Sequence, residues 1–291
     1  DAVFNPLLRQ ETFWQEGIRL VVDADGVPHF DGVVFNEMKG EMSDHDSIVA
    51  RQSIRTLYPD TPYFFESGGT PEEIVRLDYR QFAAYYGTYY HPSNCRLFLY
   101  GSVAAQPLLA LLDDHYLCGY SAISPAGPSP LAKPWARPKT AVVTSVADEG
   151  MDRHDATVTL SWATTLVEEP LQTLTLSILT DILLGNPGAP LYKAIIDSHL
   201  CKDVSDVSGM DTGFRQMPFT VGFKGIDPDD ASKAQELVLQ TLKELVLKGI
   251  DPKLVSNAVK RHEFSVRELS GDMPTGIKAM NRAMRGWLQG L

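Results

Sequence analysis

Residues 121–138 contain five prolines and show no amphipathic period. Each proline ring fixes φ and biases the preceding residue towards an extended conformation, so this stretch can form neither a regular helix nor a central strand. We therefore predict a semi-rigid connector over 121–138. It divides the chain into a first part, residues 1–120, and a second domain, residues 139–291. A length of 291 residues agrees with two domains of about 150 residues each.

The spacing of apolar residues and the positions of Gly and Pro predict helices and short strands in both parts. In the first part we expect helices over 32–57, from 71, over 78–90 and over 107–117, with one strand over 96–100. In the second part we expect strands over 140–146 and 157–165, a hairpin of 202–211 with 216–226, and helices over 171–184, 190–200, 228–249 and from 252. This mixture predicts the α+β fold class.

Charge excludes two classes of partner. The chain has 26 Lys and Arg against 37 Asp and Glu, a net charge of −11 at pH 7. Nucleic acid and anionic lipid would be repelled, so we expect no nucleic-acid partner and no membrane partner. The longest apolar runs, such as residues 108–112, are much shorter than a membrane-spanning helix requires.

Cysteine usage indicates a reducing compartment. Cys95, Cys118 and Cys201 are few, odd in number and lack CxxC spacing, so neither a disulfide framework nor a structural zinc site is expected. We interpret each thiol as a small buried apolar group. A bacterial cytoplasm and an organelle matrix both fit this pattern.

Glu37, Glu41 and His45 form the main candidate for chemistry in the first part. Their spacing is i, i+4 and i+8, so they would share one face of an uninterrupted helix, and these side chains are common ligands of divalent metals. Gly40 and Ser43 weaken that helix in its middle. A solvated acidic face is the alternative, and spacing alone favours it. Neither HExxH nor HxxEH occurs in the sequence.

Two further features have structural explanations that we prefer. Five aromatic residues recur at helical spacing, which is more typical of core packing than of a binding surface. They are Phe82, Tyr85, Tyr86, Tyr89 and Tyr90. The Ser67-Gly68-Gly69 segment can be a substrate loop, but it is better explained as an ordinary turn.

Five motifs in order resemble one protein family. They are GVVFNEMKG at 32–40, SGGTP at 67–71, YYHPSN at 89–94, LLGNPGAPLYKAII at 183–196 and HEFSVRE at 262–268. Together they make the chain similar to the M16 zinc metallopeptidases, and most similar to the presequence-protease branch, whose relatives include falcilysin. The resemblance extends from Asp1 to about Gln289.

The resemblance implies two M16-type α/β sandwich domains with antiparallel-rich sheets. Residues 1–120 correspond to the C-terminal part of the first domain, which is therefore incomplete, and 139–291 correspond to most of the second. The opening at Asp1, without a starting Met, fits an excised or trimmed piece of a larger peptidase. The partners implied are peptide substrates and the remaining N-terminal and C-terminal parts of the same polypeptide.

The family's metal site assigns a role to one residue here. An HxxEH motif supplies two zinc-binding histidines and the catalytic glutamate, and a glutamate on a later helix supplies the third ligand. Glu37 of the NEMKG motif matches that glutamate, so we predict that Glu37 is a metal ligand. The resemblance begins downstream of HxxEH. It therefore implies zinc in the full-length protein, poor or absent zinc in this piece, and no catalytic residue here; substrate-binding residues stay unassigned.

The implied activity is that of the parent protein: zinc-dependent endopeptidase cleavage of short, unstructured peptides in an enclosed chamber. The acidic charge favours basic or amphipathic peptides. Two alternatives stay open at this point. One is a non-catalytic scaffold or partner subunit with the same fold. The other is a free-standing divalent-metal binder that uses Glu37, Glu41 and His45.

Overall fold

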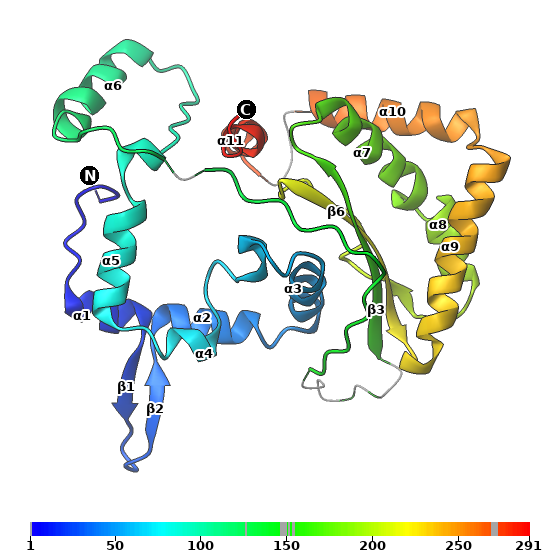
Figure 1. The fold of residues 1–291 in the computed structure, drawn as a ribbon, viewed down its shortest axis with the longest axis horizontal. Helices are drawn as coiled ribbons and strands as arrows, with labels where there is room; N and C mark the ends of the chain where they lie inside the picture. Colours follow the sequence, from blue (N-terminus) through cyan, green and yellow to red (C-terminus); the bar gives the residue numbers. More distant parts are fainter. Residues whose placement is uncertain (1, 126, 146–149, 151, 153–154, 269–272) are drawn as a thin grey trace.

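The computed structural model describes residues 2–125, 127–145, 150, 152, 155–268 and 273–291. Its first part holds a two-stranded hairpin that projects from a group of short helices (Figure 1). The elements are α1 (Gln10–Thr12), η1 (Phe13–Gly17), β1 (Arg19–Val22), β2 (Pro28–Asp31), α2 (Val33–Glu41), α3 (His45–Leu57), η2 (Pro62–Phe64), α4 (Pro71–Ile74), α5 (Tyr79–Tyr89), η3 (Pro92–Asn94), α6 (Ala105–Leu112) and η4 (Asp113–Leu117).

The second part is built on one antiparallel sheet with helices against it. Its elements are β3 (Ala156–Leu166), α7 (Pro170–Leu184), α8 (Pro190–Asp197), β4 (Asp203–Val204), β5 (Gly209–Met210), β6 (Gln216–Ile226), η5 (Pro228–Asp230), α9 (Ala231–Lys248), α10 (Pro252–Arg267) and α11 (Thr275–Trp287). Strand β6 is central: it pairs with β3 on one side and with β4 and β5 on the other.

The two faces of β3 differ because successive side chains point to opposite sides of a sheet. Val158, Leu160 and Trp162 pack against the core beneath the helices. Thr157 and Thr159 point to the other side, where His45 and Ser53 of α3 reach them at 2.9 and 3.1 Å. One face of the sheet is therefore apolar, and the opposite face is small and polar.

The apolar face carries the main core of the molecule. Leu191, Ile195, Val221, Phe223 and Val238 are fully buried there, contributed by α8, β6 and α9. In Figure 1, α7, α8, α9 and α10 lie on this side of the sheet, and α3 lies on the other side. Helix α3 thus joins the first part of the chain to the sheet of the second.

Most of the expected helices are confirmed, including the starts at Pro71, Pro190 and Pro252 and the end of α9 at Gly249. The strand over 157–165 is confirmed as part of β3. The hairpin is confirmed with an interrupted first strand, β4 and β5, opposite β6. The described structure therefore agrees with the α+β class.

Two expected strands are wrong. Residues 96–100 and 140–145 have no strand assignment, and Val146 lies outside the described residues. The side chains have strand-like composition, but a strand also needs a neighbour for its backbone groups. Within the described ranges, neither segment pairs with another strand. In the same ranges, no helix is long and apolar enough to cross a membrane.

Candidate functional site

Helix α2, which carries Glu37, is anchored by one apolar face. Phe35 and Met38 are buried in a small cluster with Phe13, Ile18 and Ile74. Glu37 lies away from this cluster and is exposed to solvent. Its carboxylate has no hydrogen bond or ion pair with any residue that the structure describes, so both oxygens are free to accept a ligand.

The expected stripe of Glu37, Glu41 and His45 is broken. Helix α2 ends at Glu41, and α3 starts anew at His45 with Asp44 as its N-cap. The backbone N–H of Ser47 donates to Asp44, and this bond lowers the pKa of the Asp44 carboxyl below its usual value. Because the helix is interrupted, His45 does not continue the face that bears the two glutamates.

Glu41 and His45 have structural contacts instead. The Ser47 hydroxyl donates to Glu41 Oε1 at 2.8 Å, which links the two helices. The His45 ring lies 2.9 Å from the Thr157 hydroxyl of β3. The shared-face interpretation of these three residues is wrong for His45, and the physical reason is the new helix start at Asp44.

A zinc site needs three protein ligands around the metal. No group of three His, Cys, Asp or Glu side chains able to hold a metal occurs among the described residues. These residues therefore do not form a complete zinc site, and we derive no chemical step through a metal. Glu37 by itself offers one carboxylate, fewer than the three protein ligands that a zinc site needs.

The Ser67-Gly68-Gly69 turn supports α2, which the sequence did not reveal. Gly69 has a φ of 81°, in the left-handed region that glycine tolerates, and its N–H donates to the Glu66 carbonyl at 3.0 Å. A Cβ on Gly68 would collide with the sulfur of Met38. The turn thus packs directly on the helix that carries Glu37, and its glycines are needed for this close approach.

The aromatic residues of α5 do not form a core, so that expectation is wrong. Tyr85 and Tyr89 are 62% and 49% exposed, and their ring centroids lie 4.6 Å apart. Phe82 is half exposed and lies 5.4 Å from the ring of Phe13. These rings contact one another along the helix because no larger element covers them in the described structure.

The cysteine expectation is also partly wrong. All three thiols are free, but Cys95 and Cys118 are exposed. Only Cys201 is partly buried, and this burial raises the pKa of its thiol.

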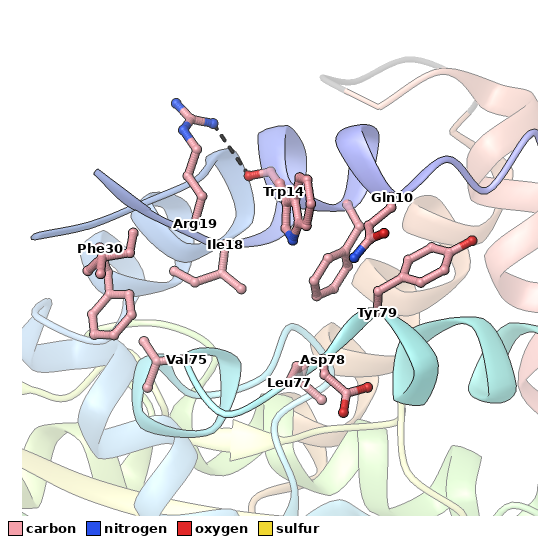
Figure 2. A pocket seen from close by; sticks show the side chains of 11 residues that line it. Gln10, Trp14, Ile18, Arg19, Phe30, Val75, Leu77, Asp78 and Tyr79 are labelled. Carbon is pink, nitrogen blue, oxygen red and sulfur yellow. Dashed lines mark hydrogen bonds between the residues drawn. The ribbon is translucent and has the colours of Figure 1, made fainter. Parts of the chain in front are cut away.

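A groove of about 590 Å³ lies between the N-terminal elements and the α4–α5 connection. Figure 2 shows Trp14, Ile18 and Phe30 on one side and Val75, Leu77 and Tyr79 on the other. The remaining lining residues are Gln10, Phe13, Arg19, Leu20 and Asp78. The walls are mostly apolar.

A smaller, charged pocket of about 290 Å³ lies where α3 meets the sheet. Lys224 of β6 forms ion pairs with Asp46 at 2.5 Å and with Asp206 at 3.5 Å. The hydrogen bond to Asp46 is the main cause of a raised pKa for Lys224. Lys202 pairs with Asp155 at the same pocket. These pairs join α3 to the second part of the chain.

Solved structures share this arrangement of an antiparallel sheet and helices. A putative M16-like peptidase from Alicyclobacillus acidocaldarius matches with a TM-score of 0.57 and 18% identity, over 87% of this chain and 59% of that one. A conserved protein from Enterococcus faecalis V583 matches with a TM-score of 0.60 and 17% identity, over 88% of this chain and 55% of that one. The fold is therefore the α+β fold of M16-like peptidases.

The chain belongs to the M16 peptidase family. The family model described as the Peptidase M16 inactive domain matches residues 76–261, which is more than half of the sequence. The match confirms the family that the motifs at 32–40 and 183–196 suggest.

Relatives at the sequence level are several times longer. The mitochondrial presequence protease of Danio rerio is 31% identical over 278 residues, which cover 93% of this chain and 27% of that protein. The mitochondrial presequence protease of Mus musculus is 33% identical with the same coverage. Protein HypA of Clostridium perfringens is 33% identical over 99% of this chain and 30% of its own length. The chain thus spans less than a third of these relatives.

Proposed function

We propose that this chain is part of a zinc-dependent endopeptidase that cleaves short, unstructured peptides in an enclosed chamber. Membership of the M16 family and the presequence proteases among its relatives support a peptidase. The observation that carries the finer proposal is the exposed, unpartnered carboxylate of Glu37 on an anchored helix. Other parts of the same polypeptide would supply the rest of the site.

In this proposal Glu37 is one ligand of the metal. Together with ligands from other parts of the polypeptide, Glu37 would hold a zinc ion, and that ion would supply Lewis-acid activation for peptide hydrolysis. The residues of this chain have a positioning role: Phe35 and Met38 hold α2 in place, and the turn at Gly68 packs behind it. No general base is assigned to this chain.

The proposed substrates are basic or amphipathic peptides, because a net charge of −11 would attract them. The proposed partners are these peptides and the remaining N-terminal and C-terminal parts of the polypeptide. The proposed compartment is a reducing one, either a bacterial cytoplasm or an organelle matrix. Turnover of basic and acidic peptides of equal length, compared at low salt, tests the charge preference.

The direct test of the activity begins with the coding region that precedes Asp1. An HxxEH motif within about a hundred residues, a distance set by domain size, supports the peptidase. In the encoded protein, Glu37→Gln should lower zinc affinity and turnover by at least about tenfold. Glu41→Gln, one helical turn further on the same exposed face, is the matched control and should retain both. Wild-type zinc content in Glu37→Gln would refute the ligand assignment.

A second candidate is a non-catalytic scaffold or partner subunit with the M16 fold. The matching family model is described as an inactive domain, and the described residues lack a three-ligand cluster. This candidate predicts that no HxxEH motif precedes Asp1 and that the natural protein contains no stoichiometric zinc. Elemental analysis of that protein separates the two candidates.

A further inference from the structure

Helix α2, which carries Glu37, starts without a capping side chain. Its N-cap residue is Gly32, which has no side chain that can accept a hydrogen bond, and its described first turn contains no acidic residue. The first N–H groups of a helix have no partner inside the helix, and a capping side chain usually accepts from one of them. Other contacts must therefore hold the start of α2 in place.

The first of these contacts is between backbones. A Cβ on Gly32 would lie 2.2 Å from the carbonyl oxygen of Gly17, the last residue of η1. Only glycine permits so close an approach. The start of α2 therefore rests directly on the end of η1, just before β1 begins.

The second contact is a chain of polar side chains. The Asn36 amide Nδ2 donates to Asp31 Oδ1 at 2.9 Å, and Arg19 of β1 donates to Asp31 Oδ2. Arg19 also donates to the carbonyls of Gln15 at 3.1 Å and of Trp14 at 3.4 Å, and Figure 2 shows the bond to Trp14. Asp31 thus connects α2 to β1 and, through Arg19, to η1.

The Asp31 carboxylate is held in its charged form. The hydrogen bond from Asn36 is the main cause that lowers the pKa of Asp31 below its usual value, and the charge of Arg19 acts in the same direction. A carboxylate can only accept hydrogen bonds, so Asn36 must present its NH₂ group and not its oxygen to Asp31. This bond therefore defines the orientation of the Asn36 amide.

The bond to Asp31 lies on a different side of α2 from the apolar cluster. Phe35 and Met38 are buried in that cluster, and residues that follow each other in a helix point about 100° apart around its axis. Contacts on two sides of a helix fix its rotation about the axis better than one apolar face does. Because Glu37 directly follows Asn36, this rotation sets the direction in which the Glu37 side chain points.

We infer that Asn36 and Asp31 are positioning residues, which set the direction of the Glu37 carboxylate through the rotation of α2. They act through the helix, and Glu37 is still the proposed ligand. The inference rests on the proposed function, because the direction of Glu37 matters for chemistry only where Glu37 holds the metal. It extends that proposal from the ligand to the residues that orient it.

A positioning role differs from a role in stability. The bond between Asn36 and Asp31 is exposed to solvent. Exposed polar contacts add little to the free energy of unfolding, because water replaces them when they break. Variants of this pair should therefore have a urea midpoint close to that of the wild type. Weaker zinc binding at unchanged stability is the result that indicates positioning.

A charge exchange in the encoded full-length protein tests the inference. Asn36→Asp places two carboxylates together, so it should weaken zinc binding by about tenfold in a competition with a chelator. Adding Asp31→Asn should restore binding, because the new amide can donate to the carboxylate at position 36 and accept from Arg19.

Adding Asp25→Asn to Asn36→Asp is the matched control. Asp25 is exposed and lies in the turn between β1 and β2. The two double variants have the same net charge and the same sequence in α2, so they differ only in which hairpin carboxylate is removed. The control should bind zinc as weakly as Asn36→Asp alone.

Hydrogen exchange of the metal-free protein gives a measurement that does not depend on zinc. The amides of residues 33–41 should exchange faster in Asn36→Asp than in the wild type, and adding Asp31→Asn should reverse this change. With Co²⁺ in place of zinc, the visible absorption, which reports the geometry of the ligands, should shift in Asn36→Asp and return in the double variant with Asp31→Asn.

Three outcomes would overturn the inference. They are wild-type zinc affinity in Asn36→Asp, equal restoration by Asp25→Asn and Asp31→Asn, and unchanged exchange of residues 33–41. Absence of zinc binding by the wild type would refute the proposed function instead. Faster exchange in Asn36→Asp that Asp31→Asn reverses would, in that case, still support the hold of this pair on α2, so the two failures are distinguishable.

Discussion

Tyr58 links the two parts of the chain through a single buried side chain. It is 1% exposed, directly follows α3, and its hydroxyl donates to the Gln216 carbonyl of β6 at 2.8 Å. Its ring stacks on Phe214 with centroids 6.0 Å apart. Tyr58 lies between a helix and a proline-containing loop, and nothing in the local sequence indicates that its hydroxyl bonds to a residue 158 positions away.

Tyr58→Phe should lower the free energy of unfolding by about 1–2 kcal/mol, because the partly buried Gln216 carbonyl loses its donor. Urea unfolding with an unchanged slope measures this loss. Tyr89→Phe is the matched control, since Tyr89 is 49% exposed, and this variant should have the urea midpoint of the wild type. An unchanged midpoint in Tyr58→Phe would mean that the bond contributes nothing.

The buried phenol of Tyr58 also predicts that the free energy of unfolding depends on pH in the alkaline range. Burial is the main cause that raises the pKa of Tyr58 far above its usual value. Below about pH 10 the phenol is neutral in both states, so its contribution to stability is fully present. Above that pH the unfolded chain releases the proton first, so the free energy of unfolding should fall as pH rises. Urea midpoints at increasing pH should fall more steeply for wild type than for Tyr58→Phe.

At the scale of elements, periodicity and capping predict where helices lie, but not what they contact. The capping box of Asp78 with Gln81 marks the start of α5, and Pro at the first turn marks α7, α8 and α10. Residues 96–100 have the composition of a strand and still find no partner in the described structure. Pairing is a tertiary property, so local sequence cannot determine it.

Two glycines in different elements should respond oppositely to alanine. A Cβ on Gly222 of β6 would lie 2.6 Å from the Ser205 Cβ, so Gly222→Ala should destabilise the sheet by about 1–3 kcal/mol. Gly87 of α5 has no atom within 4 Å of such a Cβ, and Gly87→Ala should stabilise by about 0.5–1 kcal/mol through helix propensity. Thermal unfolding compares the two; equal effects would contradict this packing.

At the scale of the whole molecule, the surface is larger than that of a typical closed monomer. The accessible area is 19172 Å², whereas a monomer of this mass exposes about 12,000 Å². The exposed aromatic rings of α5 and the exposed side chains of Leu20 and Val22 on β1 belong to this excess. Such a surface agrees with the proposal that further parts of a longer polypeptide pack against this chain.

The proposed division at 121–138 gives a prediction for limited proteolysis. Residues 136–145 are all exposed and lie outside helices and strands. Lys139 in this segment is followed by Thr140, so trypsin can cleave the bond between them. Lys133 and Arg137 are each followed by a proline, which blocks cleavage by trypsin. Trypsin should therefore cut after Lys139, and Lys139→Ala should remove this cut.

The two products, residues 1–139 and 140–291, should stay together on size-exclusion chromatography. Helix α3 packs on β3, and the backbone N–H of Arg215 donates to the Tyr63 hydroxyl at 2.9 Å. Separate elution of the two fragments would show that these contacts do not hold the parts together.

The sequence by itself determined the α+β class, the positions of most helices and the family, because caps, prolines and apolar periods act locally and the motifs are contiguous. Only the tertiary structure decided which strands pair, that α3 starts anew at Asp44 so that His45 reaches Thr157, and that the rings of α5 stay exposed. These features depend on contacts between residues far apart in the chain. Both levels bear on Glu37: its sequence motif predicts a metal ligand, and the structure shows that its carboxylate is exposed on α2 and free.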